Sequence, residues 1–258
     1  MSTAENSSFW DSNTSDSTPA QRLAGIGFAI LSPSALSAEI GAPIEACAPL
    51  FALWEDLPAD PYLLDGGHYR RRRHGSFMLE HADDPTSAHL RSVPQRPHWQ
   101  PKTYNALHGG LFRHFAPLST ELSAAPAFVQ LLQGLGRLFA SLRSTHTWFI
   151  EAHQFRIDTH EGIGRPTPEG AHRDGVDFIA VLMIARHQII GGETRVFEAE
   201  GMRGVRFTLE EPCSALLMDD TRVIHESTPI QPADKPDAGW RDTLVLTFRA
   251  GGFLEPGS

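Results

Sequence analysis

Three residues of the chain have the types and spacing of a metal-binding triad. His172 and Asp174 are separated by one residue, directly before the apolar run Val176 to Ile184. Residues two apart on an extended chain project to the same side, so both side chains can bind one ion. His225 follows 51 positions after Asp174 (225 − 174), an interval that holds about three predicted strands. We expect the fold to bring His225 back beside the first pair.

A His-x-Asp pattern is short enough to occur by chance, and the chain has a second copy at His81 to Asp83. Asp84-Pro85 follows that copy, which is typical of a turn, so we interpret it as a surface turn. The run after Asp174 is instead typical of a strand buried on both faces. It predicts a rigid support for His172 and Asp174, which we expect to open that strand.

Two histidines and one carboxylate on one face of an octahedron leave three coordination positions open. This arrangement suits Fe(II) and its chemistry with oxygen. Zinc accepts similar ligands together with a bound water. The three residues alone therefore leave a zinc hydrolase as an alternative to an iron oxygenase.

The elements expected to hold these residues are mostly short strands. After residue 146 the sequence alternates between short β-rich runs and turn residues such as Gly191-Gly192 and Asp219-Asp220. This spacing predicts an antiparallel sandwich or barrel rather than βαβ units. The predicted strands are Thr147 to Ile157, Val176 to Ile184, Thr194 to Phe197, Val205 to Leu209, Ser214 to Met218, Arg222 to His225 and Thr243 to Phe248.

Helices are predicted on the N-terminal side of these strands. Apolar residues recur at steps of three and four between Phe128 and Leu142, which predicts an amphipathic helix that supports a sheet. A second helical region is expected from Ser32 to Trp54, capped by Ser32 before Pro33 and split near Gly41 and Pro43. Residues 1 to 20 are polar and are predicted to be a disordered tail. Residues 21 to 258 are predicted to form one domain with an N-terminal helical region.

The composition excludes several classes of function. The formal net charge of −9 opposes general binding to nucleic acid or to anionic membranes. The two cysteines, Cys47 and Cys213, form no CxxC pattern, so we expect neither a disulfide framework nor a thiolate metal site. We see no secretion signal and no run of 18 apolar residues, and we expect a cytoplasmic protein. The sequence does not determine the oligomeric state, and a homo-oligomer is compatible with it.

One basic run, Arg70 to Arg73, lies between Tyr69 and Phe77 in a stretch that could be a strand. Alternate arginines would then face opposite sides. We favour a solvated edge strand, because charges at sheet edges prevent unwanted strand pairing. The alternative is that one of the inward-facing pair binds an anion.

Several longer stretches carry a resemblance to a known enzyme group. They are Asp65 to Arg73, His153 to Ile157, Pro168 to Phe178, Gly191 to Thr194, Leu217 to Pro229 and Arg241 to Arg249, and they extend over about residues 60 to 250. With these stretches the chain resembles the bacterial 2-oxoglutarate- and Fe(II)-dependent dioxygenases, a group that includes free amino-acid hydroxylases such as L-isoleucine 4-hydroxylase.

The resemblance implies a mainly β fold with flanking helices, the double-stranded β-helix or jelly roll of the cupin type. It implies Fe(II) held by His172, Asp174 and His225, with 2-oxoglutarate and O2 consumed and succinate and CO2 released as the substrate is hydroxylated. In that group a basic residue after the distal histidine binds the far carboxylate of 2-oxoglutarate. Arg241 matches this position, 16 residues beyond His225 (241 − 225), with Arg249 as a competitor.

The implied substrate is a small molecule, a free or carrier-bound amino acid. Its recognition requires a cation for a carboxylate and an acceptor for an ammonium group. The candidates are Gln154, Arg156, Arg173 and Glu169, of which Gln154 and Arg156 share one strand face. Two alternatives remain: a cupin-type isomerase or hydrolase that does not use 2-oxoglutarate, and a non-catalytic jelly-roll binding protein.

Overall fold

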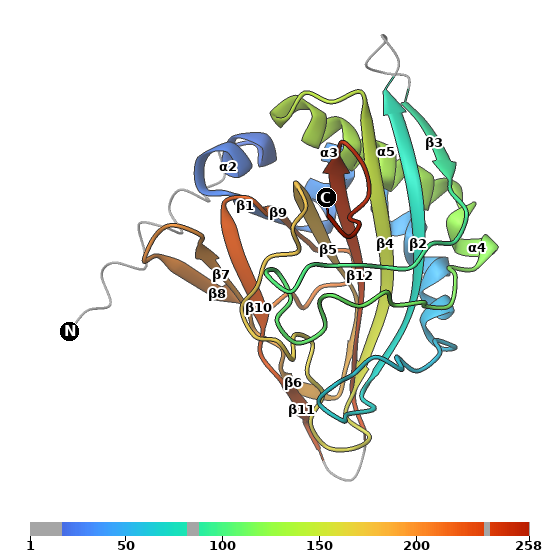
Figure 1. The fold of residues 1–258 in the computed structure, drawn as a ribbon, viewed down its shortest axis with the longest axis vertical. Coiled ribbons are helices and arrows are strands. Elements are labelled where there is room, and N and C mark those ends of the chain that lie inside the picture. Colours follow the sequence, from blue (N-terminus) through green and yellow to red (C-terminus); the bar gives the residue numbers. More distant parts are fainter. Residues whose placement is uncertain (1–16, 82–87, 235–237, 258) are drawn as a thin grey trace.

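The computed structural model describes residues 17–81, 88–234 and 238–257 (Figure 1). Its centre is a seven-stranded antiparallel sheet with the strand order β1-β9-β5-β12-β4-β2-β3. The strands of this sheet are β1 Phe28–Leu31, β9 Ala215–Asp219, β5 Phe178–His187, β12 Trp240–Ala250, β4 Thr147–Asp158, β2 Arg70–His81 and β3 Ala88–Ser92.

Two smaller sheets lie against one face of this main sheet. One has the order β10-β7-β8 and the other pairs β11 with β6. Their strands are β10 Val223–Ser227, β7 Thr194–Glu198, β8 Gly204–Phe207, β11 Ile230–Pro232 and β6 Ile189–Gly191. The fold is therefore mostly β, and the predicted jelly roll is confirmed.

The opposite face of the main sheet is covered by helices (Figure 1). They are α2 Pro19–Ile26, α3 Pro33–Ile40, η1 Ile44–Trp54, α4 Thr120–Ser123 and α5 Pro126–Leu142. The predicted amphipathic helix is α5, and the prediction that Ser32 and Pro33 begin a helix that stops at Gly41 is also confirmed. Among the described residues no single helix is long and apolar enough to cross a membrane; α3 and η1 pass that test only as a pair bent by 112°.

The alternation of side chains along β5 separates two cores. Phe178, Ala180 and Leu182 join the cluster that packs against the helices. Ile179 and Met183 face the other way, into the cluster shared with β7, β8 and β10. The prediction that this strand is buried on both faces is thus confirmed. Val181 and Val245 pack against the second core and also line the cavity of the functional site.

Two N-terminal predictions need correction. Helix α2 begins at Pro19 and is capped by Thr18, which exchanges hydrogen bonds with Gln21, so the predicted tail extends too far. Residues 1–16 lie outside the described residues. Strand β2 pairs with β4 along the arginine run, while β3 pairs only with residues 77–81 of β2. The other side of the run is covered by the segment before it, through the hydrogen bonds from Asp60 N–H to the carbonyl of Arg70 and from Arg72 N–H to the carbonyl of Pro58. Arg70 and Arg72 are buried on its inner face, so the solvated-edge interpretation is wrong for both of them.

Other predictions concern single residues. Cys47 and Cys213 are both free thiols. The second His-x-Asp pattern can be followed only to His81 at the end of β2, because Ala82 and Asp83 lie outside the described residues.

Candidate active site

The predicted triad comes together between the main sheet and the β10-β7-β8 sheet. His172 and Asp174 lie in the loop before β5, which begins at Phe178, so they precede that strand rather than open it. The loop is tied to β10 instead: His172 N–H donates to the carbonyl of His225, and His225 N–H donates to the carbonyl of His172, each at 3.0 Å. This backbone pairing brings the two histidine rings to 4.6 Å between centroids.

A buried carboxylate fixes the rest of this loop. Asp220 accepts hydrogen bonds from the backbone N–H groups of Asp174, Gly175 and Val176 at 3.1, 2.8 and 3.1 Å. Burial and the nearby Asp174 carboxylate raise the pKa of Asp220 to about 7. The rigid support of Asp174 thus comes mainly from Asp220 after β9, which the sequence did not reveal.

The donor set fits a divalent cation. The ligand atoms of His172, Asp174 and His225 all lie within 4.8 Å of one another. His172 Nδ1 lies 2.9 Å from the carbonyl of Gly170, which fixes Nδ1 as the protonated nitrogen and leaves Nε2 free to bind a metal. Burial, together with the neighbouring His172, lowers the pKa of His225 to about 4, so its imidazole is neutral, as a metal ligand requires.

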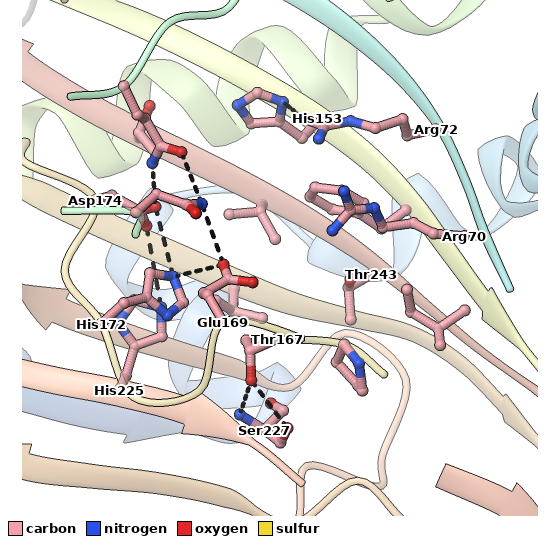
Figure 2. A pocket seen from close by; sticks show the side chains of 18 of the residues that line it. Arg70, Arg72, His153, Thr167, Glu169, His172, Asp174, His225, Ser227 and Thr243 are labelled. Atoms are coloured by element: carbon pink, nitrogen blue, oxygen red, sulfur yellow. Dashed lines mark hydrogen bonds and ion pairs between the residues drawn. The ribbon is translucent and has the colours of Figure 1, made fainter. Parts of the chain in front are cut away.

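Beside the triad is a cavity of about 130 Å³, which is small compared with the pockets that hold drug-sized ligands. Figure 2 shows the triad and Glu169 on one side of this cavity, with Arg70 and Arg72 entering from the opposite side. One wall of the cavity is formed by side chains of the main sheet. Arg70 of β2 and Arg241 of β12 lie in one row across the strands, because both are register partners of Ile157 in β4. The other apolar side chains on the wall are Phe155, Pro166, Val181 and Val245.

Arg241 lines this cavity and Arg249 does not. Arg241 is only 4% exposed, and within the described ranges its guanidinium has neither a hydrogen-bond partner nor a carboxylate within 4.0 Å. Burial and Arg186, its register partner on β5, lower the pKa of Arg241 to about 10, so it remains a cation at neutral pH. Arg249 instead donates to the carbonyls of Gly252 and Phe253.

Of the four predicted substrate residues, only Glu169 lines the cavity. Gln154 and Arg156 do share a face of β4, but it is the helix side: Gln154 donates to the carbonyl of Leu53, and Arg156 pairs with Asp242 and Glu55. Alternation places His153, Phe155 and Ile157 on the cavity side instead.

Arg173 also points away from the cavity. Its Nε donates to the carbonyl of Asp220 at 2.5 Å, and its guanidinium lies over the ring of Tyr104. A residue between two ligands that face one side must itself face the other side, so the position of Arg173 follows from the same alternation that pairs His172 with Asp174. The structure therefore does not support Gln154, Arg156 or Arg173 as substrate residues.

Two groups of lining residues were not predicted from the sequence. The first is a buried cluster in which Glu151 of β4 bonds His74 of β2 at 3.1 Å and His98, from the segment after β3, at 2.9 Å, with His153 of β4 packed beside them. Of these four residues His98 and His153 line the cavity. Alternation along β2 and β4 could have indicated the three residues on these strands. The second group, Gln100, Asn105 and Arg113, lies in the irregular segment between β3 and α4, where no periodicity exists to indicate which side chains point inward.

Comparison with known proteins identifies the family. Residues 52–247 match the sequence profile of the 2OG-Fe dioxygenase family, and the chain belongs to this family. A search of curated proteins found no match. It follows that the protein is an oxygenase that depends on Fe(II), 2-oxoglutarate and O2 and acts on a small-molecule substrate. The two alternatives, an isomerase or hydrolase without 2-oxoglutarate and a non-catalytic binding protein, are not favoured.

Solved structures share the fold of this chain. A bsmA homologue from Methylobium petroleophilum is 55% identical, with a TM-score of 0.87 over 93% of this chain and 95% of that one. IDO from Bacillus thuringiensis has a TM-score of 0.72 at 16% identity, covering 91% and 95% of the two chains. The Fe(II)/α-ketoglutarate-dependent dioxygenase TqaL has a TM-score of 0.65 at 20% identity, covering 90% and 85%. The last two likenesses show the fold alone.

Proposed function

We propose that the protein hydroxylates an amino acid or a close derivative, with Fe(II) held by His172, Asp174 and His225. The observation that carries the proposal is the position of the triad beside a small cavity that also contains a buried, unpartnered arginine and a buried acidic side chain. The iron, when bound, would supply the oxidising chemistry with O2 and 2-oxoglutarate: one oxygen atom goes into succinate, formed with loss of CO2, and the other into the hydroxylated substrate. The cytoplasmic location predicted from the sequence remains a prediction.

Arg241 is the proposed anchor for 2-oxoglutarate. A planar guanidinium can bind a carboxylate through two parallel hydrogen bonds, and this one has no competing carboxylate within 4.0 Å in the described part of the chain. Arg186 adds positive charge beside it. Thr243 lies two residues further along β12 on the same face and also lines the cavity. Arg241 would thereby hold the far end of 2-oxoglutarate while its keto acid end reaches the metal.

Glu169 is the proposed acceptor for the substrate's ammonium group. Its side chain is 9% exposed, and its Oε1 lies 3.6 Å from His172 Nε2, so it borders the metal site. Its Oε2 is buried without a hydrogen-bond partner. A buried carboxylate oxygen without a donor is costly, and an ammonium group would satisfy it. The apolar side chains Phe155, Ile157, Val181 and Val245 suit an aliphatic side chain next to it.

The test is aerobic incubation with Fe(II), ascorbate and 2-oxoglutarate against a panel of L-amino acids, with succinate and the gain of one oxygen measured by mass spectrometry. We expect one panel member to stimulate succinate release and to be hydroxylated. His172→Ala should lose both signals and bound iron, because two remaining ligands hold the metal poorly. The control is His89→Ala on β3, a histidine outside the cavity, which should keep both signals.

Two outcomes would contradict the proposal. Oxygenation that proceeds equally well without 2-oxoglutarate would remove the role of Arg241. Succinate release stimulated only by molecules without an amino group would remove the role of Glu169 and the amino-acid class.

A further inference from the structure

Gln100 joins the predicted metal ligand Asp174 to a buried cation. Its Nε2 donates to Asp174 Oδ1 at 2.8 Å, and its Oε1 accepts from a terminal nitrogen of Arg113, also at 2.8 Å. Asn105 Nδ2 donates to the same oxygen at 3.3 Å. Because two N–H donors meet at one end of the amide, that end is the oxygen, and the end that faces Asp174 is the N–H donor. The direction of the hydrogen bond to Asp174 is therefore fixed.

The segment that carries Gln100 is irregular but closely held. His98 and Arg113 exchange two backbone hydrogen bonds, each at 2.9 Å, and Gly110 N–H donates to the carbonyl of Gln100 at 2.7 Å. The side chains of Gln100 and Arg113 are buried, with 5% and 2% of each residue exposed. Side chains that are locked by packing and hydrogen bonds hold a functional group more precisely than free ones do. Gln100 is therefore placed to fix the orientation of the Asp174 carboxylate.

Arg113 is linked to this carboxylate through the amide. In the described part of the chain its guanidinium forms no salt bridge, and its Nε has no hydrogen-bond partner. Hydrogen bonds in a chain polarise one another, so the cation at Oε1 of Gln100 makes the Nε2–H group a stronger donor. The positive charge thus acts on Asp174 without an ion pair that would compete with a metal ion for the carboxylate.

The hydrogen bond distinguishes the two oxygens of Asp174. Oδ1 lies 3.8 Å from His172 Nε2, and Oδ2 lies 4.0 Å from His225 Nε2, so the histidines alone favour neither oxygen as the metal ligand. Gln100 uses one lone pair of Oδ1, whereas Oδ2 accepts no hydrogen bond from the described residues. Oδ2 is therefore the more available oxygen. A carboxylate bound through one oxygen leaves three coordination positions open, which is what 2-oxoglutarate and O2 require together.

We propose that Gln100 is a positioning residue that holds Asp174 Oδ1 away from the metal, and that Arg113, through Gln100, lowers the electron density which this carboxylate donates to the iron. The inference rests on the proposed function, because it takes His172, Asp174 and His225 as the metal ligands. It adds two residues outside the triad that set how strongly the carboxylate binds the iron.

The test compares Gln100→Leu with the unchanged enzyme, each saturated anaerobically with Fe(II) and 2-oxoglutarate. The measurement is the visible absorption band in which an electron moves from the iron to the bound 2-oxoglutarate. Without its hydrogen bond Asp174 donates more electron density, through one oxygen or both, so the iron loses an electron more readily. The band should therefore move to longer wavelength.

Gln100→Asn is a second variant for the same measurement. It keeps a buried amide, but its side chain is one carbon too short to reach Asp174 as Gln100 does. It should shift the band in the same direction, which keeps the test independent of how well Gln100→Leu folds.

Arg113→Met tests whether the cation acts through Gln100. In the otherwise unchanged enzyme it should shift the band in the same direction and by less, because the amide hydrogen bond remains but is weaker. In the Gln100→Leu background it should cause no further shift, since the connecting hydrogen bond is already lost. The matched control is Gln133→Leu on α5, because Gln133 Nε2 also donates at 2.8 Å, but to the carbonyl of Ala88. The control should leave the band unchanged.

The outcomes separate this inference from the proposed function. Absence of the band in the unchanged enzyme, or an unchanged band in His172→Ala, would refute the proposed metal site itself. With the band present, a Gln100→Leu band that stays in place or moves to shorter wavelength would overturn the inference, even where Fe(II) affinity falls. An Arg113→Met shift of equal size in both backgrounds would also overturn it, since Arg113 would then act on 2-oxoglutarate directly.

Discussion

At the scale of single residues, Asp220 holds in place the loop that carries the predicted metal ligand Asp174. Its carboxylate receives three consecutive backbone N–H groups from the loop that carries Asp174. Carboxylates in this position orient metal ligands, and their loss typically weakens metal affinity 10- to 100-fold.

Asp220→Ala should therefore weaken Fe(II) binding by about 10- to 100-fold, because the loop loses all three acceptor contacts. The measurement is a titration with Fe(II) under anaerobic conditions and with 2-oxoglutarate in excess, followed by the visible absorption of Fe(II) bound together with 2-oxoglutarate. Asp220→Asn, which keeps one carbonyl acceptor, should be weakened less. Equal Fe(II) affinity in Asp220→Ala and the unchanged enzyme would show that the loop is held without this carboxylate.

The choice between Arg241 and Arg249 is a second question at this scale. Arg241→Gln should raise the KM for 2-oxoglutarate on the order of 10- to 100-fold, since a charged bidentate partner is lost. Arg249→Gln should leave that KM unchanged, because Arg249 contacts the carbonyls of Gly252 and Phe253 rather than the cavity. A KM that rises in Arg249→Gln and not in Arg241→Gln would reverse the assignment. Steady-state succinate formation at varied 2-oxoglutarate is the measurement.

At the scale of elements, helix α5 approaches its neighbours through glycine. A Cβ built on Gly134 would lie 2.5 Å from the Cα of Ile40 at the end of α3, which is closer than real side chains come to backbone. The backbones of α3 and α5 can therefore touch only because this position lacks a side chain. This contact fixes the helical layer that supports the main sheet.

Gly134→Ala should lower the free energy of unfolding by about 1 to 3 kcal/mol, since overpacking outweighs the roughly 1 kcal/mol that alanine gains over glycine in a helix. Gly25→Ala in α2 is the matched control, because nothing lies within 4 Å of its Cβ position. This control should be neutral or slightly stabilising. Urea unfolding followed by far-UV circular dichroism measures both, and a stabilised Gly134→Ala would mean that α3 moves freely.

The periodic elements could be predicted from the sequence, and the contacts between them could not. Apolar residues recur with the helical period between Phe128 and Leu142 and form short β-rich runs in the second half, so the sequence alone indicates these elements. The triad followed from residue type and strand count. Which face of β4 carries Gln154 depends on the position of η1, which has no sequence signal in β4 itself. Likewise Arg113 reaches the cavity along an irregular path that no pattern describes.

For the whole molecule, the buried cluster around Glu151 links stability to pH. Burial lowers the pKa of His98 to about 4 and that of His153 well below its usual value. The nearby Glu151 carboxylate raises the pKa of both histidines, but by less than burial lowers it. The pKa of Glu151 is itself lowered by His98 and His74, although burial opposes this. Arg72 and Arg113 add positive charge on the same side. Both histidines are therefore neutral in the folded protein near neutral pH.

The sign of the pH effect follows from these directions. A histidine with a lowered pKa binds fewer protons folded than unfolded, so the stability is full above the unfolded pKa of 6.5 and is lost as the pH falls from 6.5 towards 4. The pKa change of His98 alone corresponds to a loss on the order of 3 kcal/mol at pH 4. Glu151 adds to the loss only below its usual pKa of 4.5. The raised pKa of Asp220 acts in the opposite direction, which makes the comparison with a His98 variant essential.

His98→Gln keeps a hydrogen-bond donor for Glu151 but cannot be protonated in this range. Between pH 7 and pH 4 the unchanged protein should lose on the order of 3 kcal/mol more of its unfolding free energy than His98→Gln does. Urea unfolding at half-unit pH steps gives both curves, and the difference between them cancels Asp220 and the other titratable groups that do not contact His98. Parallel curves would mean that His98 is protonated equally in the folded and unfolded states. A difference in unfolding free energy that grows as the pH falls from 6.5 to 4 would show that His98 is neutral in the folded protein, beside the buried cations Arg72 and Arg113.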